Sequence, residues 1–159
     1  MATWSEFAAQ APKVAEGGQK LFYQHGVPLG YLASIRKDGG PRIHPVCPIL
    51  EGGELWLLIG NHSPKNWDLL RDGRFALHAF PVPKGDDEFM VAGTAVHVTD
   101  PDTVASVESA LAATGASSSD HTLFRLSIAR ALLSLYVPDP NGPGGIWPPD
   151  YFKWRESVS

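Results

Sequence analysis

The chain has 159 residues, of which 43% are hydrophobic and 19% are charged. This length suits one compact domain, and this composition excludes an intrinsically disordered chain. The formal net charge is −4 and no cluster of Lys or Arg stands out, so nucleic acid is not an expected partner.

The single cysteine, Cys47, excludes an internal disulfide framework and suits a reducing cytoplasm. The first residues have neither a basic start nor a long apolar run, so we expect no signal peptide. No apolar stretch reaches the roughly 20 residues that a membrane-spanning helix needs. We therefore expect a cytoplasmic protein with no membrane partner.

The chain is predicted to begin with a helical segment over residues 1–26, in which a helix over residues 3–24 ends near Gly26. Glycine-containing turns then separate three strands, over residues 29–36, 42–50 and 55–59. Pro45 and Pro48 inside the second strand indicate an edge or an irregular stretch that lines a ligand. The third strand has no polar residue, so we expect it to be buried on both faces.

A short helix follows the third strand and is predicted to begin at Pro64, with Ser63 as its N-cap residue. A second helix is predicted from Pro101 to near Gly115. Four further strands are expected, over residues 74–80, 88–98, 122–128 and 131–137. Residues 138–159 are expected to form an irregular tail with four large aromatic side chains, Trp147, Tyr151, Phe152 and Trp154.

This order of elements predicts a small antiparallel barrel with short helices around it. A Rossmann fold is excluded, because no Gly-x-Gly-x-x-Gly joins a strand to a helix and long helices do not alternate with the strands. We expect a single domain over residues 1–159.

The loop from Gly60 to Asn66 joins the buried third strand to a helix N-terminus. Such a terminus offers free backbone N–H groups and the positive end of the helix dipole. Ser63 adds a hydroxyl and Lys65 an ammonium, and this combination suits a phosphate group. Taken alone, the pattern also fits an ordinary capped helix with a solvated lysine, and the local sequence leaves both interpretations open.

The ordered motifs from Leu29 to Phe80 resemble those of the FMN-binding split-barrel family of pyridoxamine 5′-phosphate oxidase. In chain order they are a Lys-Asp-Gly hairpin, Arg-x-His-Pro-Val, Gly-x-Leu-Trp-Leu and Gly-x-x-Ser-x-Lys-x-x-x-Leu. The resemblance implies a mainly β (α+β) fold: an antiparallel split β-barrel of about six to seven strands with short peripheral helices. It also implies a homodimer with FMN at the subunit interface.

The resemblance further implies roles for individual residues. Arg42, Ser63 and Lys65 would hold the FMN phosphate, and Asn66 would add a polar contact. The isoalloxazine ring would be lined, partly by backbone groups, by Ile43, His44, Pro45 and Val46. Leu58 and Ile59 would lie beside the ring or the ribityl chain. Among the tail aromatics, which more often pin a tail than contact a cofactor, Trp147 is the best candidate to reach the flavin.

Two departures from the oxidase change what we expect. Pro64 stands where the oxidase has an arginine, so either the phosphate is held less tightly or Arg42 carries more of the grip. The tail from Trp154 to Ser159 does not reproduce the Arg- and His-bearing segment that holds pyridoxal phosphate. We therefore expect a flavin-dependent oxidoreductase with another small-molecule substrate, and we assign no catalytic residue.

Two alternatives remain open. A deazaflavin-dependent reductase has the same fold, but its long anionic coenzyme would favour more Lys and Arg along the groove than this chain offers. A non-catalytic flavin- or heme-binding protein is the other alternative, with His44 and His62 as heme ligands. The six histidines show no paired metal-ligand spacing, so we expect no metal site.

Overall fold

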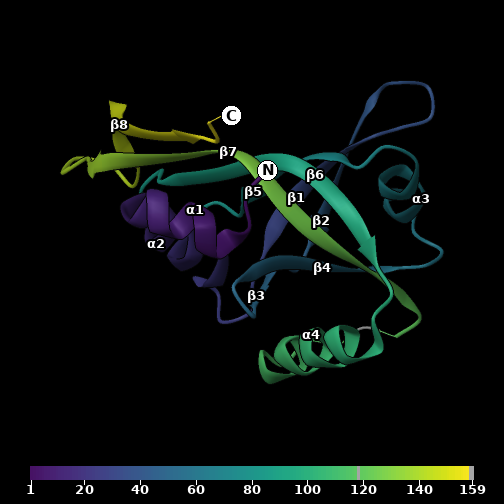
Figure 1. The fold of residues 1–159 in the computed structure, drawn as a ribbon. Helices are drawn as coiled ribbons and strands as arrows, with labels where there is room; N and C mark the ends of the chain where they lie inside the picture. Colours follow the sequence, from purple (N-terminus) through teal and green to yellow (C-terminus); the bar gives the residue numbers. More distant parts are fainter. Residues whose placement is uncertain (118, 158–159) are drawn as a thin grey trace.

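The structure is a computed structural model that describes residues 1–117 and 119–157. Within them, eight strands form one antiparallel sheet in the order β2-β1-β5-β6-β7-β4-β3, and β8 pairs with β7 (Figure 1). The strands are β1 (Gly30–Ile35), β2 (Pro41–Val46), β3 (Ile49–Glu51), β4 (Glu54–Gly60), β5 (Arg74–Ala79), β6 (Glu88–Val98), β7 (His121–Pro138) and β8 (Gly145–Arg155). The helices are α1 (Trp4–Gln10), α2 (Pro12–Tyr23), α3 (Pro64–Arg71) and α4 (Pro101–Ala113).

The N-terminal segment contains two helices, so the prediction of one helix over residues 3–24 is wrong. Ala11 precedes Pro12 and has φ −139°, because the proline ring disfavours a helical conformation in the residue before it. Pro12 then occupies the first turn of α2, where a missing N–H does no harm. The start of α1 is fixed by a capping box, in which Glu6 N donates to Thr3 Oγ1 over 3.1 Å and Thr3 N donates to Glu6 Oε2 over 2.8 Å.

The predicted second strand, over residues 42–50, is two strands at opposite ends of the sheet order. β2 pairs with β1, whereas β3 pairs with the first half of β4. Pro48, which has no N–H to donate, lies in the break between them. β3 pairs with residues 54–56 of β4, so the rest of β4 pairs only with β7 among the described strands. The sheet is therefore not hydrogen-bonded between β2 and β4.

The C-terminal region forms a long hairpin, so two predictions are corrected there. The strands expected over residues 122–128 and 131–137 are one strand, β7. The tail expected to be irregular is β8 over Gly145–Arg155, which pairs with the second half of β7. Pro148 and Pro149 hide the alternation that follows, in which Phe152 and Trp154 turn inward and Tyr151 and Lys153 turn outward. Residues 158–159 of the predicted tail lie outside the described residues.

The hairpin of β7 and β8 is pinned at its base and supported near its tip. At the base, the Trp154 ring lies 5.0 Å from that of Phe7 on α1, between centroids. Near the tip, Asp86 Oδ2 accepts a hydrogen bond from Gly145 N over 2.6 Å, and Asp87 Oδ1 accepts one from Tyr136 N over 2.8 Å. The tip extends beyond α1 and α2 at the upper left of Figure 1. We call this hairpin the arm.

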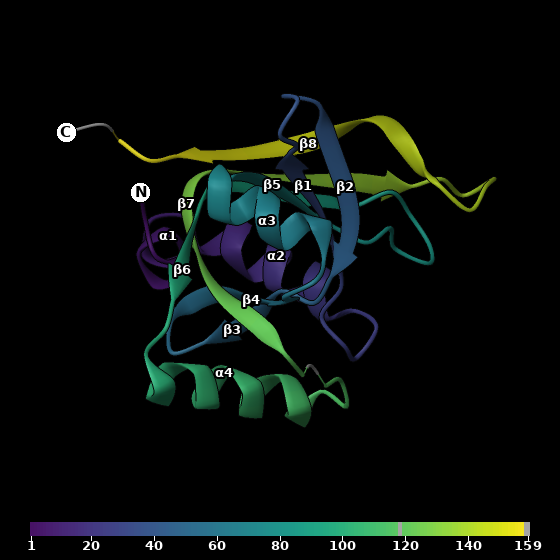
Figure 2. The same cartoon turned by 90° about the vertical axis from the view of Figure 1, so that its right-hand side faces the viewer.

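The main core lies between the sheet and the helices α1 and α2. Its fully buried side chains include Phe7, Phe22, Leu57, Phe89 and Leu126. A second, smaller core lies under α4 and contains Ile49, Trp56, Val107, Leu111 and Leu123. Figure 2 shows α4 below β3 and β4, whereas α3 covers another part of the barrel next to β1 and β2. The N-terminal loop of α3 and the strand β2, which carry several predicted site residues, thus lie on the same part of the barrel.

Phe89→Ala should remove much of the chain's stability. The Phe89 ring is fully buried and contacts the rings of Trp4 and Phe22 edge-on, so its loss leaves a cavity among side chains that cannot collapse into it. We expect a loss of about 3–5 kcal/mol in the free energy of unfolding, measured by urea denaturation at one protein concentration. Lys37→Ala, in the exposed β1–β2 turn, should change it by less than about 0.5 kcal/mol. Equal effects of the two variants would contradict this packing.

Candidate functional site

Four of the predicted site residues come together where β2 passes the N-terminus of α3. The alternation of the strand turns Arg42 and His44 to one face, where both are half-buried. Ser63 and Lys65 approach this face from the start of α3. This group of Arg42, His44, Ser63 and Lys65 is called the anion cluster below.

Lys65 is the cation of this cluster that has no carboxylate partner among the described residues. Its Nζ donates to Ser63 Oγ over 3.1 Å, and partial burial lowers the pKa of the ammonium. No side chain caps the N-terminus of α3, because the Ser63 hydroxyl accepts from Lys65 instead. Pro64 has no N–H, and the N–H groups of Ser63 and Asn66 donate to the carbonyl oxygens of Gly60 and Ser63, so the Lys65 N–H is the backbone donor left for an anionic ligand in this turn.

Arg42 is held by a buried carboxylate that the sequence analysis missed. Asp68 on α3 is 4% exposed, and its Oδ2 accepts hydrogen bonds from Arg42 Nε over 2.6 Å and from Ser34 Oγ over 3.0 Å. Arg71 donates to Asp68 Oδ1 over 3.2 Å. Burial alone would raise the pKa of Asp68, but the hydrogen bonds from Arg42, Ser34 and Arg71 outweigh it and lower the pKa. Asp68 is therefore ionised, and its single negative charge is shared between Arg42 and Arg71.

His44 lies in a setting that keeps its imidazole neutral. Burial is the largest cause of its lowered pKa, and the positive charges of Lys65 and Arg42 lower it further, against the opposing effect of Asp68. A neutral imidazole can donate one hydrogen bond and accept another. His44 can thus contact a ligand in the cluster without adding charge to it.

The other residues predicted to line the site do not bring their side chains into the anion cluster of this chain. Ile43, which is 66% exposed, and Pro45 lie on the opposite face of β2, and Val46 is buried in the main core. Ile59 is also buried in the main core, and Leu58 packs against the second core. Only backbone atoms of these two β4 residues could border a ligand at the cluster.

Asn66 and Trp147 are placed differently from each other. Asn66 is buried, and its Nδ2 donates to the carbonyl oxygen of Asn61 over 3.2 Å, whereas its Oδ1 has no partner. Such an orphaned acceptor near the anion cluster fits a ligand that brings a donor, as a ribityl chain does. Trp147 is 72% exposed on the arm, far from α3 in Figure 1. Within one chain it cannot reach the cluster.

Metal and membrane sites find no support in the described residues. In the described ranges, no three His, Cys, Asp or Glu side chains gather in a way that could hold a metal ion. His62 is 92% exposed, and its Nε2 lies 3.3 Å from Asp120 Oδ2. Over the same ranges, every helix is too short or too polar to cross a membrane. Burial raises the pKa of the Cys47 thiol, which packs against the second core.

Comparison with known proteins identifies a family and a fold. The model of the family described as pyridoxamine 5′-phosphate oxidase matches residues 21–134, which is more than half of the chain. The matched range contains the whole anion cluster and Asp68. A search of curated proteins finds no match.

Three of the similar solved structures illustrate the fold. A heme binding protein from Mycobacterium smegmatis is 20% identical with a TM-score of 0.60, and the match covers 86% of this chain and 57% of that one. HupZ from Group A Streptococcus is 14% identical with a TM-score of 0.61, over 73% of this chain and 90% of that one. A NimC/NimA family protein from Clostridium acetobutylicum is 13% identical with a TM-score of 0.60, over 87% and 93%. These identities establish a shared fold and nothing finer.

His44→Asn should flatten the loss of stability on acidification. The pKa of His44 in the folded chain lies below the ordinary value of 6.5, so the unfolded chain binds this proton more readily. The His44 contribution therefore lowers stability as the pH falls from 6.5 through the folded-state pKa, and the variant lacks it. Urea denaturation at about pH 7.5 and about pH 5.5 measures the difference. An unchanged pH dependence in this variant would contradict the account, and His97→Asn, at an exposed position, is the control.

Proposed function

Because the chain belongs to the pyridoxamine 5′-phosphate oxidase family, we propose that it binds FMN and acts as an oxidoreductase on a small molecule. One observation carries the proposal. Lys65 has no carboxylate partner among the described residues and lies beside an uncapped helix N-terminus, as a phosphate dianion requires.

The residues of the anion cluster would divide the work of binding. The Lys65 ammonium, the Ser63 hydroxyl and the backbone N–H of Lys65 would hold the phosphate. Arg42 would add a hydrogen bond from its remaining N–H groups, in an orientation fixed by Asp68. Neutral His44 and backbone atoms of β2 would border the ring. When bound, FMN itself supplies the electron transfer, and the chain supplies binding and orientation.

The pairing of Arg42 with Asp68 bears on the missing arginine at Pro64. Arg42 is not a free cation, since Asp68 lies 2.6 Å from its Nε. It is therefore a poor replacement for the missing charge, and Lys65 would carry most of the electrostatic attraction. We propose that FMN is held less tightly here than where the arginine is present.

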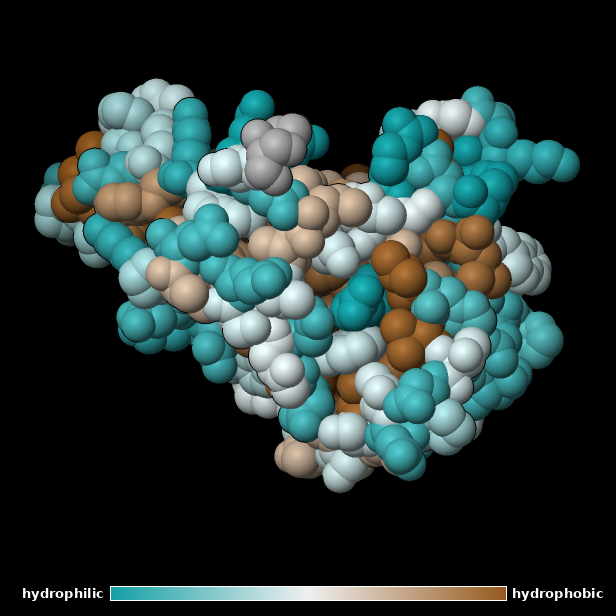
Figure 3. Space-filling model, in the orientation of Figure 1, coloured by the Kyte–Doolittle hydropathy of each residue, from teal (hydrophilic) through white to brown (hydrophobic). Residues whose placement is uncertain are grey.

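The exposed apolar surface supports the homodimer. Ile43 on β2 and two residues of α3, Trp67 and Leu70, are exposed on either side of the anion cluster. The tip of the arm exposes Val137, Ile146 and Trp147, and apolar colour gathers at this end of the molecule in Figure 3. Such patches mark interfaces on soluble proteins. In a two-fold dimer, the arm of one subunit could bring Trp147 to the anion cluster of the other.

A heme-binding function is the second candidate. One similar structure is a heme binding protein, and the neutral imidazole of His44 is the form that binds iron. Against it, the nearby Lys65 fits a phosphate at close range, and His62 is already paired with Asp120. A deazaflavin would need more free cations beside Arg42. Arg36 there is paired with Asp38 over 2.9 Å, which leaves Lys37 as the added cation. The phosphate-sized site at Lys65 and this shortage of cations favour FMN over heme and over a deazaflavin.

Lys65→Ala should weaken FMN binding by about 1.5–3 kcal/mol, the range for a hydrogen bond to a charged group. Riboflavin, which has no phosphate, should be affected far less. Titration of both ligands by flavin fluorescence compares the wild type with Lys65→Ala and with the exposed control Lys37→Ala. An equal loss for FMN and riboflavin would mean that Lys65 acts on the ring or on the fold, and the phosphate assignment would fail.

Sedimentation of the FMN-loaded protein tests the dimer. We expect a two-fold dimer with an interface above roughly 2,000 Å², typical of obligate dimers. Such a dimer should persist at about micromolar concentration. Trp147→Ala, at the tip of the arm, should weaken the dimer or FMN binding, whereas Lys84→Ala should change neither. A monomer with flavin bound would contradict this assembly.

A further inference from the structure

Two arginines face each other across neighbouring strands without a negative partner. Five of the seven arginines in the chain form ion pairs with carboxylates, namely Arg36, Arg42, Arg71, Arg74 and Arg125. The other two, Arg130 on β7 and Arg155 on β8, are direct cross-strand partners. Neither forms an ion pair or a side-chain hydrogen bond with a described residue. Like charges directly opposite each other destabilise a sheet, so this pair costs stability in the free protein.

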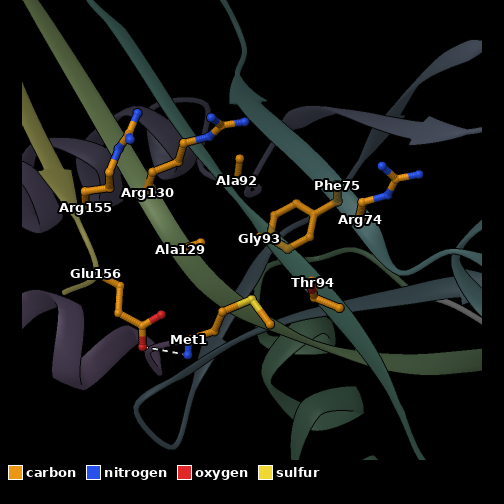
Figure 4. A pocket seen from close by; sticks show the side chains of 10 residues that line it. All are labelled: Met1, Arg74, Phe75, Ala92, Gly93, Thr94, Ala129, Arg130, Arg155 and Glu156. Carbon is orange, nitrogen blue, oxygen red and sulfur yellow. Dashed lines mark ion pairs between the residues drawn. The ribbon is translucent and has the colours of Figure 1, made fainter. Parts of the chain in front are cut away.

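The two arginines lie at the rim of a hollow with an apolar floor. The pocket has a volume of about 410 Å³, and its floor is formed by Phe75, Ala92, Gly93 and Ala129. Figure 4 shows the guanidinium groups of Arg74, Arg130 and Arg155 pointing to the same side above this floor. An adjoining pocket of about 130 Å³ shares Arg130 and Arg155 and adds Lys153.

A β-bulge builds this hollow. The register of β6 against β7 shifts between Ala92 and Gly93, which leaves Ala129 without a cross-strand partner on β6. A Cβ at Gly93 would lie 1.9 Å from Ser127 O, so the close approach of the two strands requires glycine there. Glu156 also lines the pocket, and its Oε1 lies 2.6 Å from the amino group of Met1.

We propose that this pocket binds a small organic phosphate, with the phosphate held by Arg130 and Arg155 and the apolar part resting on the floor. The planar guanidinium forks suit bidentate contacts to phosphate oxygens, and a bound dianion would turn the repulsion of the pair into attraction. Arg74 would contribute less, because Asp72 lies 2.6 Å from its NH2 group. The volume suits a ligand of one ring with a phosphate. The site is separate from the proposed cofactor site, since neither Arg42 nor Lys65 lines it.

Calorimetry with phenyl phosphate as the probe tests this site. Four proteins are compared: the wild type, Arg130→Gln/Arg155→Gln, the charge-matched control Lys37→Gln/Lys84→Gln, and Lys65→Ala. We expect saturable binding that is at least about tenfold weaker in the double-arginine variant, within about twofold of wild type in the lysine control, and still saturable in Lys65→Ala. Inorganic phosphate should bind more weakly than phenyl phosphate. The double-arginine variant should unfold at or above the wild-type midpoint, since it loses the repulsion, and this shows that it folds.

Three results would overturn the proposal. The first is no saturable binding of phenyl phosphate to the wild type up to about 10 mM, well above the range of a built site. The second is loss of binding in Lys65→Ala with retention in the double-arginine variant, which would place the probe at the anion cluster. The third is unchanged binding in the double-arginine variant; a changed sedimentation coefficient beside it would assign the two arginines to a contact between subunits.

Discussion

The buried carboxylate of Asp68 is the constraint on which the candidate site depends. It accepts hydrogen bonds from Ser34 on β1, from Arg42 on β2 and from Arg71 within α3, so it joins three elements at the open side of the barrel. A buried charge is tolerated only when it is paired and hydrogen-bonded, and removing one partner of such a group is costly. The position of α3, and therefore of its N-terminus, follows from this network. Because Asp68 pairs with Arg42 and Arg71, Lys65 is the cation of the anion cluster that has no carboxylate partner among the described residues.

Much of the fold could be predicted from local sequence, and the exceptions have physical causes. The start of α3 was predicted correctly at Pro64 because N-cap and N1 preferences are local. The apolar run over residues 55–59 is also confirmed as part of a strand, β4, in which Leu55, Trp56, Leu57 and Ile59 are buried. The division of residues 42–50 and the pairing of β8 were not predicted, because both depend on strands that lie far away in the sequence. Pro148 and Pro149 are tolerated in β8 because, among the described strands, only β7 pairs with it.

The geometry of the candidate site follows in part from local sequence. Motif spacing along the chain selected Arg42, His44, Ser63 and Lys65, and the structure places β2 next to α3. The alternation of side chains along β2 places Ile43 and Pro45 on the opposite face, a consequence that the motif match alone does not contain. Asp68 carried one signal that was available, an acidic residue three positions from both Lys65 and Arg71 on a short helix. Its burial against β1 and β2 depends on tertiary contacts that no local pattern contains.

We propose above all that this chain binds a flavin that carries a phosphate. The most direct measurement isolates the protein from cells without added cofactor, releases any bound chromophore by denaturation, and identifies it by mass and absorbance. The account predicts FMN at about one molecule per subunit. Heme, a deazaflavin, or riboflavin without its phosphate as the bound chromophore would contradict it.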